Sequence, residues 1–444
     1  MTFDLRKESL RYHSSFPQGK LKITSSKPVK TQKDLTLAYT PGVAEPCIEI
    51  SKDKEKVFSY TNRGNSVAII TDGTAVLGLG KIGPLAALPV MEGKSVLFKK
   101  FADIDAYPIC LNLGGGTGDD YLNYFVSTIK AMEPSFGGIN LEDIAAPTCF
   151  DLQEKLSGEM GIPVFHDDQK GTAIVVTAAL TNALKLACKK FENIKIVMSG
   201  AGAAGIAIAK LLLEYKVSKK QIFLCDSKGL VVNSRDDIND EKRNFAQQAT
   251  PNSIGLGEAL KNADVFIGVS AAGVLKPEMI KNMNKSPIIF AAANPIPEIM
   301  PKDAFSAGAY IVATGRSDFQ NQINNSLGFP GIFRGALDVR AKTINMAMQI
   351  AASKAIAELV NEPASGKILK ILKKAYPKEA KIFSSPSSLN KFYIVPKQFD
   401  LRVVPRVARM VAKAAMETKV AQVKIANLEA YEKSVFKRIL ANWK

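Results

Sequence analysis

The feature that most constrains the fold is an alternation of short apolar runs and helical patterns between about residues 194 and 315. The apolar runs read IKIVMSG, QIFLCD, DVFIGVS, PIIFAAAN and YIVATG, and segments with helical periodicity such as AAGIAIAKLLLEY separate them. Strands that are apolar throughout and alternate with helices are typical of a parallel sheet that is covered on both faces. This part of the chain therefore predicts a doubly wound, Rossmann-like α/β domain.

Glycines in this segment predict a dinucleotide site. Gly200, Gly202 and Gly205 form a G-x-G-x-x-G pattern after the strand KIVMS, and Ala203 and Ala204 open the next helix. The first glycine permits a tight turn, the second lets a pyrophosphate approach the backbone, and the third lets the helix pack on the strand. The free N–H groups at the start of the helix would then hold the diphosphate.

The next strand ends at Asp226, where a carboxylate in such a domain binds the ribose hydroxyls. A carboxylate at this position favours NAD, because it repels the 2′-phosphate of NADP. Lys228 follows closely and could compensate that repulsion. From these residues alone, the choice between NAD and NADP stays open.

A chain of 444 residues is too long for one ordinary core, so we expect several units. Residues 1–155 contain the β-rich runs SVAIITDG and AYPICLNL and the loop GGGTGDD, and predict an N-terminal α/β domain. Residues 156–400 hold the dinucleotide-binding domain, framed by the helical stretch KGTAIVVTAALTNALKLACKK and by another from roughly Phe333 to Val360. Residues 401–444 predict a helical segment that contains VARMVAKAAMETKVA and a polar helix from Ala426 onward.

The formal net charge of +17 raises nucleic acid as a partner. The basic residues are mostly dispersed, and the densest group, between Lys367 and Lys397, is broken by three prolines, which is typical of a solvated peripheral segment. Since no nucleic-acid-binding motif accompanies the charge, we expect it to attract anionic substrates or phosphates, with no nucleic-acid partner. The lack of a long apolar run and of a signal peptide predicts a cytoplasmic protein without a membrane partner.

The five cysteines lie in apolar or small-residue settings and form no CxxC pair. This pattern is typical of buried thiols rather than of zinc ligands. We therefore expect all five to be core residues, namely Cys47, Cys110, Cys149, Cys188 and Cys225.

Carboxylates rather than histidines dominate the candidate catalytic residues. Of the two histidines, only His166 could serve as a base. The segment LEDIAAP supplies Glu142 and Asp143, and FHDDQKGTA supplies Asp167 and Asp168 at the start of a helix. Four carboxylates at the edges of apolar segments are costly unless a hard divalent cation such as Mg²⁺ or Mn²⁺ compensates them. For the aspartate pair alone, capping of the helix is an equally good explanation.

Several unusual segments occur in one order along the chain: LAYTPGVAEPC, TDGTAVLGLG, MEGKSVLFKKFADID, LEDIAAPTCF, FHDDQKGTA, SGAGAAG, ANPIPE and NNSLGFPGIFRGALD. From about Leu10 to Ala421 the chain resembles bacterial malic enzymes, in the short form without a fused acyltransferase-like domain. The resemblance implies oxidation and decarboxylation of L-malate to pyruvate and CO₂ with reduction of NAD or NADP, dependent on Mg²⁺ or Mn²⁺. We also expect a homodimer or higher homo-oligomer. The short bacterial form and the basic surroundings tilt the expected cofactor slightly toward NADP.

Matching the motifs of the family to this sequence assigns roles to individual residues. The general acid falls on Tyr39 and the general base on Lys94. Burial or a neighbouring cation would have to lower the pKa of Lys94, whereas Asp167, which matches the aspartate that supports the lysine, would raise it. The remaining matches are the metal ligands Glu142, Asp143 and Asp168, the substrate ligand Asn325, and Asn294, expected to contact substrate and cofactor.

One position departs from part of the family. Animal and plant enzymes carry an arginine before LGLG that helps to bind the substrate, and this chain has Val76 there. Bacterial members of this type also lack the arginine, so another group must bind the malate carboxylate.

Three other functions are compatible with the same fold. A malolactic enzyme retains its NAD and releases lactate, and a nucleotide-sensing or nucleic-acid-binding protein would keep the fold without catalysis. The intact set of Tyr39, Lys94 and carboxylates argues against that silent protein. A plain hydroxy-acid dehydrogenase would not need the carboxylates.

Overall fold

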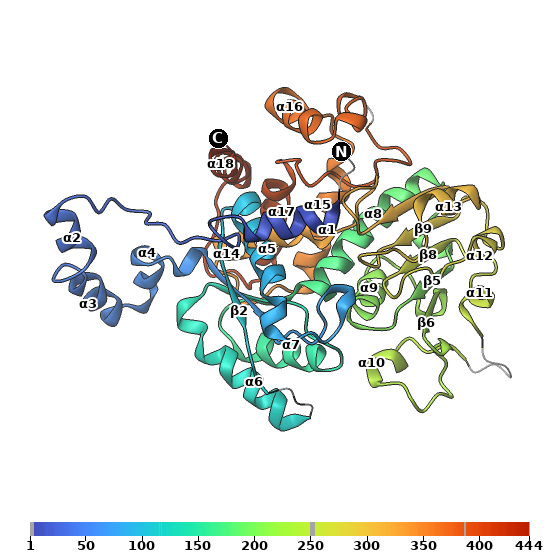
Figure 1. Cartoon of the computed structure of the whole chain (residues 1–444), viewed down its shortest axis with the longest axis horizontal. Coiled ribbons are helices and arrows are strands. Elements are labelled where there is room, and N and C mark those ends of the chain that lie inside the picture. The colour runs from blue at the N-terminus through green and yellow to red at the C-terminus, as the bar shows by residue number, and fades with distance from the viewer. Residues whose placement is uncertain (1–3, 115, 117, 249–253, 386–387, 444) are drawn as a thin grey trace.

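Two parallel sheets organise the computed structural model, which describes residues 4–114, 116, 118–248, 254–385 and 388–443 (Figure 1). The first sheet has four parallel strands in the order β2-β1-β3-β4. These strands are β1 (Ser66–Thr71), β2 (Asp105–Cys110), β3 (Gly138–Leu141) and β4 (Val164–His166). They alternate along the chain with helices α5 (Pro84–Ala102), α6 (Asp119–Ala131) and α7 (Thr148–Glu159). The N-terminal unit is therefore an α/β domain, as the sequence predicts.

The second sheet has six strands in the order β10-β9-β8-β5-β6-β7, and only β7 is antiparallel to its neighbour. The order reverses at β5, which pairs with β6 on one side and β8 on the other. A ligand crevice of a doubly wound sheet lies outside the carboxyl ends of the strands at this reversal. The strands are β5 (Ile196–Ser199), β6 (Ile222–Asp226), β7 (Gly229–Leu230), β8 (Val265–Gly268), β9 (Ile288–Ala291) and β10 (Ile311–Thr314).

Helix α8 (Thr172–Leu186) joins the two sheets and is buried along most of its length. A helix that is apolar on nearly all sides is stable only inside a core, and α8 packs against α9 (Ala203–Leu213) and α15 (Met346–Leu359). One apolar core accordingly includes side chains of both sheets. Shorter helices surround the second sheet: α11 (Leu256–Ala259), α12 (Pro277–Lys281) and α13 (Pro301–Ser306), with α10 (Asp240–Arg243) farther out in the loop region after β7.

The C-terminal helices pack on this core. The predicted helical stretch from Phe333 to Val360 contains parts of two helices, α14 (Phe329–Asp338) and α15. The stretch is interrupted because Asn345 is extended and caps α15, its side chain accepting a hydrogen bond from the Met348 N–H. The other C-terminal helices are α16 (Gly366–Ala375), α17 (Val403–Glu417) and α18 (Leu428–Ala441).

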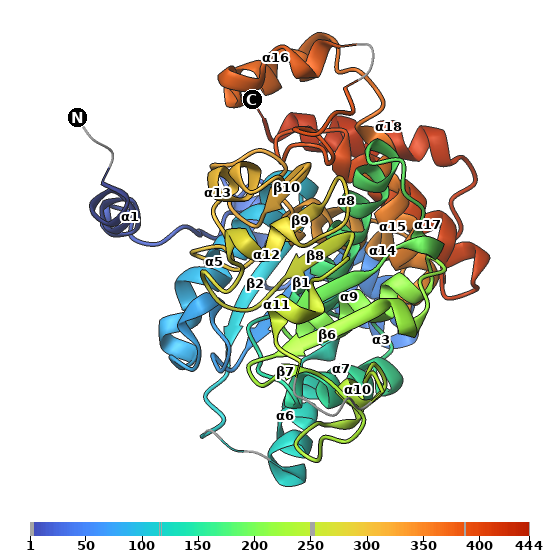
Figure 2. The same ribbon diagram turned by 90° about the vertical axis from the view of Figure 1, so that its right-hand side faces the viewer.

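An N-terminal arm, residues 5–60, projects from this body (Figures 1 and 2). It carries α1 (Leu5–Ser14), α2 (Gln32–Ala38), α3 (Ala44–Lys52) and α4 (Val57–Tyr60). None of residues 4–65 is buried, although the arm includes Phe16 and Ile23, which are more than nine-tenths exposed. Exposed large apolar side chains are thus concentrated in a segment that has no core of its own.

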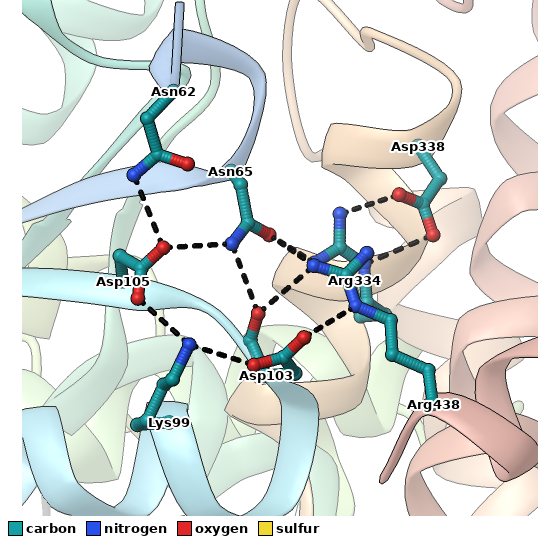
Figure 3. Close-up of polar contacts among 8 residues, drawn as sticks. All are labelled: Asn62, Asn65, Lys99, Asp103, Asp105, Arg334, Asp338 and Arg438. Atoms are coloured by element: carbon teal, nitrogen blue, oxygen red, sulfur yellow. Dashed lines mark hydrogen bonds and ion pairs between the residues drawn. The ribbon is translucent and has the colours of Figure 1, made fainter. Parts of the chain in front are cut away.

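A balanced ionic network, the Arg334 cluster, ties the N-terminal unit to α14 and α18 (Figure 3). Buried Arg334 binds the carboxylate of Asp338 and donates to Asn65 Oδ1 at 2.7 Å. Arg438 of α18 donates to Asp103 Oδ2 at 2.6 Å, and Lys99 contacts Asp103 at 2.7 Å. The cluster consists of Lys99, Asp103, Asp105, Arg334, Asp338 and Arg438, so three cations face three carboxylates.

The prediction that all five cysteines are core residues was wrong. Cys149 and Cys225 are buried and Cys110 is partly buried, but Cys47 and Cys188 are exposed. Cys47 lies on α3 of the arm, where no core exists, and Cys188 lies in the turn after α8 at a positive φ of 54°. Apolar neighbours in sequence therefore did not ensure burial.

The expected domain boundary after residue 155 falls within α7, and β4 then completes the first sheet by pairing with β3. We therefore propose that the N-terminal unit extends through His166. Within the described part of the chain, no helix is both long enough and apolar enough to cross a membrane.

Candidate functional site

The first candidate site surrounds Lys94 in the middle of α5. The ammonium group donates to Glu142 Oε1 at 2.9 Å and to the carboxylate of Asp167, and it lies 4.1 Å from the centroid of the Phe329 ring. Lys94, Glu142 and Asp167 are all buried. Two further acidic residues, Asp143 and Asp168, lie next to these side chains. They are connected through the backbone, because the Asp143 N–H donates a hydrogen bond to Asp168 Oδ2 at 2.7 Å.

Local backbone geometry brings these side chains together. Glu142 and Asp143 follow β3, and Asp167 and Asp168 follow β4, so the carboxyl ends of adjacent parallel strands supply all four carboxylates. The chain after β4 forms one π-helical turn, Asp167–Gly171, a form that is frequent at functional sites. Asp143 itself has a φ of 54°, a left-handed conformation that is uncommon for a residue with a side chain.

The electrostatics of this Lys94 cluster, namely Lys94, Glu142, Asp143, Asp167 and Asp168, are unbalanced. Burial raises the pKa of Glu142, Asp167 and Asp168 to about 7, although the Lys94 charge lowers all three. Burial also lowers the pKa of Lys94, but the charges of Asp167 and Glu142 outweigh it and the pKa is raised. The two opposing effects expected from the sequence thus leave Lys94 protonated unless a further positive charge lies beside the carboxylates.

The donor set fits a hard divalent cation, because it offers several buried carboxylate oxygens and an excess of negative charge. Among the residues that the structure describes, no three histidine, cysteine or carboxylate side chains already converge as a metal cage. Glu142 instead accepts hydrogen bonds from Lys94 and Asn140, the latter at 2.9 Å. The metal role of Glu142, Asp143 and Asp168 therefore stays a prediction that the chemistry of the site supports.

The surroundings of His166 argue against the role of base that the sequence left open for it. Its ring is fully buried directly before the Asp167–Asp168 pair, and burial lowers its pKa to about 3. Nδ1 lies 3.8 Å from Asp168 Oδ2, too far for a hydrogen bond. A neutral, enclosed imidazole of this kind packs against the site rather than exchanging protons with a substrate.

The structure brings Asn325 to this site. The Cβ of Asn325 is 3.2 Å from the point where a Cβ on Gly171 would lie, so Asn325 adjoins the π-helical turn that carries Asp167. Asn294 follows β9 and is exposed. Its carbonyl oxygen is 2.3 Å from the corresponding point on Gly78, so the loop of the first unit lies directly against it.

Tyr39 is not brought to Lys94 within the described chain. It follows α2 as its C-terminal cap, on the arm that Figure 1 shows projecting away from α5, and its side chain is 69% exposed. The proposed base and the proposed acid therefore lie on different parts of the molecule.

The second candidate site is a cavity of about 1000 Å³ beside the glycine-rich turn. It is lined by Ser199, Gly200, Ala201 and Gly202 after β5 and by Asp226, Lys228 and Lys242 farther along. On the other side it meets Ala146 and Pro147, on the loop that also carries Asp143. The cavity therefore extends to the neighbourhood of the Lys94 cluster.

Gly200 and Gly205 have the backbone geometry predicted from the sequence. Gly200 has a φ of 113°, and a Cβ on Gly205 would lie 1.9 Å from the Gly200 carbonyl oxygen. A Cβ on Gly202 would meet nothing within 4 Å, so the space above it is open to a ligand. No side chain caps the start of α9 at Ala203, and its N–H groups are available to a phosphate.

Asp226 lies at the predicted position but is already surrounded by cations. Arg235 binds its carboxylate with two hydrogen bonds of 2.9 Å, and Lys242 Nζ lies 2.9 Å from Oδ2. Lys228 contributes only its backbone N–H to Asp226, at 3.0 Å, while its ammonium group contacts Asp237 at 2.8 Å. Arg235 and Lys242, rather than Lys228, therefore offset most of the negative charge of Asp226.

Three functional candidates were missed from the sequence. Arg235 lies in the loop after β7 and Lys242 lies on α10, and for Lys242 the charged run DEKR that opens with Asp240 was the available signal. Glu298 is fully buried and accepts hydrogen bonds from the N–H groups of Ser270 at 2.8 Å and Ala293 at 3.0 Å. It thereby joins the loops after β8 and β9, and a glutamate within the apolar segment ANPIPEIM was the signal.

Two family models and a solved structure match this chain over regions that include both sites. The family model of the malic enzyme N-terminal domain matches residues 18–157, and that of the malic enzyme NAD binding domain matches residues 169–382. The crystal structure of a malic enzyme from Pyrococcus horikoshii has 44% sequence identity and a TM-score of 0.85, over 98% of this chain and 96% of that one.

Two relatives differ in what their names state. A bifunctional malic/malolactic enzyme of Bacillus subtilis is 54% identical over 97% of this chain and 98% of its own length. An NADP-dependent malic enzyme of Haemophilus influenzae is 49% identical over 97% of this chain, but the match spans only 55% of that longer protein. The names of both relatives thus include malic enzyme activity, and that of the Bacillus subtilis protein adds malolactic activity.

Proposed function

Because the chain belongs to the malic enzyme family, we propose that it oxidises and decarboxylates L-malate to pyruvate and CO₂ while a nicotinamide dinucleotide is reduced. The observation that carries the proposal is the Lys94 cluster, where a buried lysine contacts two carboxylates beside a nucleotide-sized cavity. A plain hydroxy-acid dehydrogenase has no need for such an excess of buried carboxylates.

Each residue of the site has a specific task in this proposal. Lys94 accepts the proton of the malate hydroxyl group, and Asp167 holds Lys94 in position. Glu142, Asp143 and Asp168 would hold Mg²⁺ or Mn²⁺. When bound there, the cation would supply Lewis-acid stabilisation of the oxygen charge that develops during decarboxylation.

The remaining residues handle the substrate and the second proton. Tyr39 would donate a proton to C3 of the enolate that loss of CO₂ leaves, which gives pyruvate, and Asn294 and Asn325 would orient the substrate. Val76 is fully buried and does not replace the arginine of the animal and plant enzymes.

The direct test is an assay of malate-dependent nucleotide reduction with NAD and with NADP, each with and without Mn²⁺. We expect reduction to require Mn²⁺ and pyruvate to form in equal amount. A protein that binds nucleotide but reduces none of it with malate and Mn²⁺ would contradict the proposal.

A malolactic reaction is the second candidate, because the Bacillus subtilis relative is named as a bifunctional malic/malolactic enzyme. In that reaction the nucleotide is reduced and oxidised again in the same site, so lactate accumulates without net NADH. Chromatography of the products separates the two activities, since pyruvate equals reduced nucleotide in one case and lactate exceeds it in the other.

We further propose that the working form is a homo-oligomer in which a second copy covers the N-terminal arm. Exposed apolar side chains of α1, α2 and the intervening segment would otherwise face water. Tyr39 lies on this arm, away from Lys94 of its own chain, so a partner can supply the acid that completes the site.

Complementation between two inactive variants tests this arrangement. If Tyr39 of one copy completes the site that contains Lys94 of the other copy, a refolded mixture of Tyr39→Phe and Lys94→Ala should regain activity. Half of the dimers are then mixed and each holds one intact site out of two, so up to about a quarter of wild-type activity is expected. An inactive mixture that light scattering shows to contain dimers would place Tyr39 and Lys94 of the same chain in one site. A monomeric wild-type protein would contradict the oligomer itself.

A further inference from the structure

We propose that a second cavity, around Lys170, binds the phosphate group of a small phosphomonoester at a site separate from the dinucleotide cavity. It has a volume of about 280 Å³ and lies between α7, the π-helical turn, α9 and α15. Among the described residues that line it, none is assigned above to catalysis, metal binding or nucleotide binding. Phe150 lines both cavities, so the two are neighbours.

The first observation is the ammonium group of Lys170, which belongs to the π-helical turn and is partly buried. Within the described part of the chain it makes no hydrogen bond and no ion pair. The charge nearest to it in effect is that of Lys210, which has the same sign. A cation that is withdrawn from water without a counter-charge costs free energy, so this cavity favours an anionic ligand.

The second observation comes from a different element. Gln349 of α15 lines the same cavity and is only 6% exposed, yet its side-chain amide has no hydrogen-bond partner among the described residues. Buried amide groups are normally paired, because an unpaired one loses its hydrogen bonds to water. The amide NH₂ of Gln349 can donate to a phosphate oxygen. A charged donor and a neutral donor thus remain available in one cavity.

The cations of the cavity indicate the kind of anion. Both are lysines, Lys170 and Lys210, and a lysine binds phosphate as a point charge, whereas planar carboxylates are typically bound by the two-pronged arginine. Lys210 contacts Glu241 at 2.7 Å and so neutralises that carboxylate. The other acidic residue, Glu154, is exposed, where water and salt screen its charge. The charge of Lys170 is therefore left for the ligand.

The apolar part of the lining indicates that the phosphate carries an organic group. Ile206 and Ala207 of α9 and Met346 of α15 contribute hydrocarbon surface to a cavity that is larger than a phosphate ion. Burial of an organic group on this surface would add to the binding free energy. A small phosphomonoester therefore fits better than inorganic phosphate.

Calorimetric titration of the intact, metal-free protein tests the proposal, with glycerol 3-phosphate and inorganic phosphate as probes. Saturating NADP, or NAD in a repeat, fills the dinucleotide cavity, so that its phosphate-binding turn is not available to either probe. The titration is made at pH 7.0, where Lys170 is mostly protonated, because burial and the charge of Lys210 lower its pKa only to about 8. We expect both probes to bind, and glycerol 3-phosphate to bind more tightly.

Three variants identify the groups that hold the phosphate. Lys170→Gln should raise the Kd of both probes at least about tenfold, the effect of losing one charge-assisted hydrogen bond. Gln349→Leu leaves the π-helical turn unchanged and should raise both Kd values about three- to fivefold, so it tests the site even if Lys170→Gln folds poorly. Lys261→Gln, which removes an exposed lysine paired with Glu258, should change neither.

The proposal is overturned if neither probe binds while the dinucleotide is present, since a probe that binds only in its absence occupies the dinucleotide cavity. Unchanged affinity in both Lys170→Gln and Gln349→Leu would place the phosphate elsewhere. Equal affinity of the wild-type protein for the two probes would exclude the phosphomonoester and leave free phosphate as the ligand. No malate is present, so these outcomes do not depend on the proposed function.

Discussion

Two ionic clusters take a lysine from the same helix, α5, and differ in burial and in their balance of charge. In the Lys94 cluster one lysine faces four carboxylates, whereas in the Arg334 cluster three cations face three carboxylates (Figure 3). The pKa values follow this difference. Burial raises the pKa of Asp168 to about 7, while Lys99 and Arg438 overcome burial and lower that of Asp103 to about 2.

The comparison distinguishes a binding site from a structural support. Charges that are matched in number can hold elements together, and the Arg334 cluster, in which only Arg334 is buried, joins α5, α14 and α18 in this way. Buried charges of one sign are stable only when a ligand of the other sign is present.

The largest expected effect distinguishes Lys94 from Lys99, the α5 lysines that belong to the two clusters. Lys94→Ala should reduce kcat by about 10²- to 10⁴-fold, because it removes the base, while nucleotide binding is retained. Lys99→Ala is the matched control, since Lys99 pairs with Asp103 and Asp105 on the partly exposed side of the helix. Its kcat should equal that of the wild type. Retention of more than about a tenth of wild-type kcat in Lys94→Ala would exclude it as the base.

A large loss of stability is expected from the other cluster. Arg334→Met should lower the free energy of unfolding by about 3–5 kcal/mol, because Asp338 loses its buried partner. Urea titration followed by circular dichroism measures the change. Lys130→Met, which breaks an exposed pair with Glu159, should leave the midpoint unchanged. An Arg334→Met protein as stable as the wild type would show that the cluster does not support the fold.

The same chemical change should have opposite effects in the two clusters. Asp168→Asn should stabilise the metal-free protein by about 1 kcal/mol, because it removes like-charge repulsion, and should abolish activity. Asp338→Asn should destabilise it by about 1–3 kcal/mol, since Arg334 and the Tyr431 hydroxyl both bind that carboxylate.

Thermal melting with and without Mn²⁺ provides the measurement and a control. The wild-type Tm should rise with Mn²⁺, whereas that of Asp168→Asn should rise much less. If both substitutions destabilise the metal-free protein to the same extent, the contrast between the clusters is wrong.

Features that depend on local backbone rules were predictable from the sequence. Gly200 and Gly205 occupy positions where a side chain would collide with backbone atoms, and this requirement is written in the G-x-G-x-x-G spacing. The strand pattern of residues 194–315 likewise predicted the parallel pairing of the second sheet, because strands that are apolar throughout are buried on both faces.

Features that depend on distant partners were not predictable in the same way. The sequence indicated the members of the Lys94 cluster but not whether burial or the carboxylates control the pKa of Lys94. Arg235 reaches Asp226 from an irregular loop, which no periodic pattern describes. The position of Tyr39 depends on an arm that lacks a core in a single chain, so its neighbours are not encoded locally.

The smallest expected effect is the acid dependence of the Arg334 cluster. Burial alone would raise the pKa of Asp103, but hydrogen bonds from Lys99 and Arg438 outweigh it and lower the pKa from 3.8 to about 2. Because the folded state binds this proton less readily, the stabilisation is complete above about pH 4 and is lost as the pH falls from 3.8 toward 2. Solvent screening of this partly exposed group keeps the contribution below about 1 kcal/mol.

Urea midpoints should therefore differ between wild type and Asp103→Asn at pH 7 and converge near pH 2. A difference that persists unchanged to pH 2 would assign the effect to packing, and Asp236→Asn, at an exposed carboxylate, should follow the wild-type curve throughout.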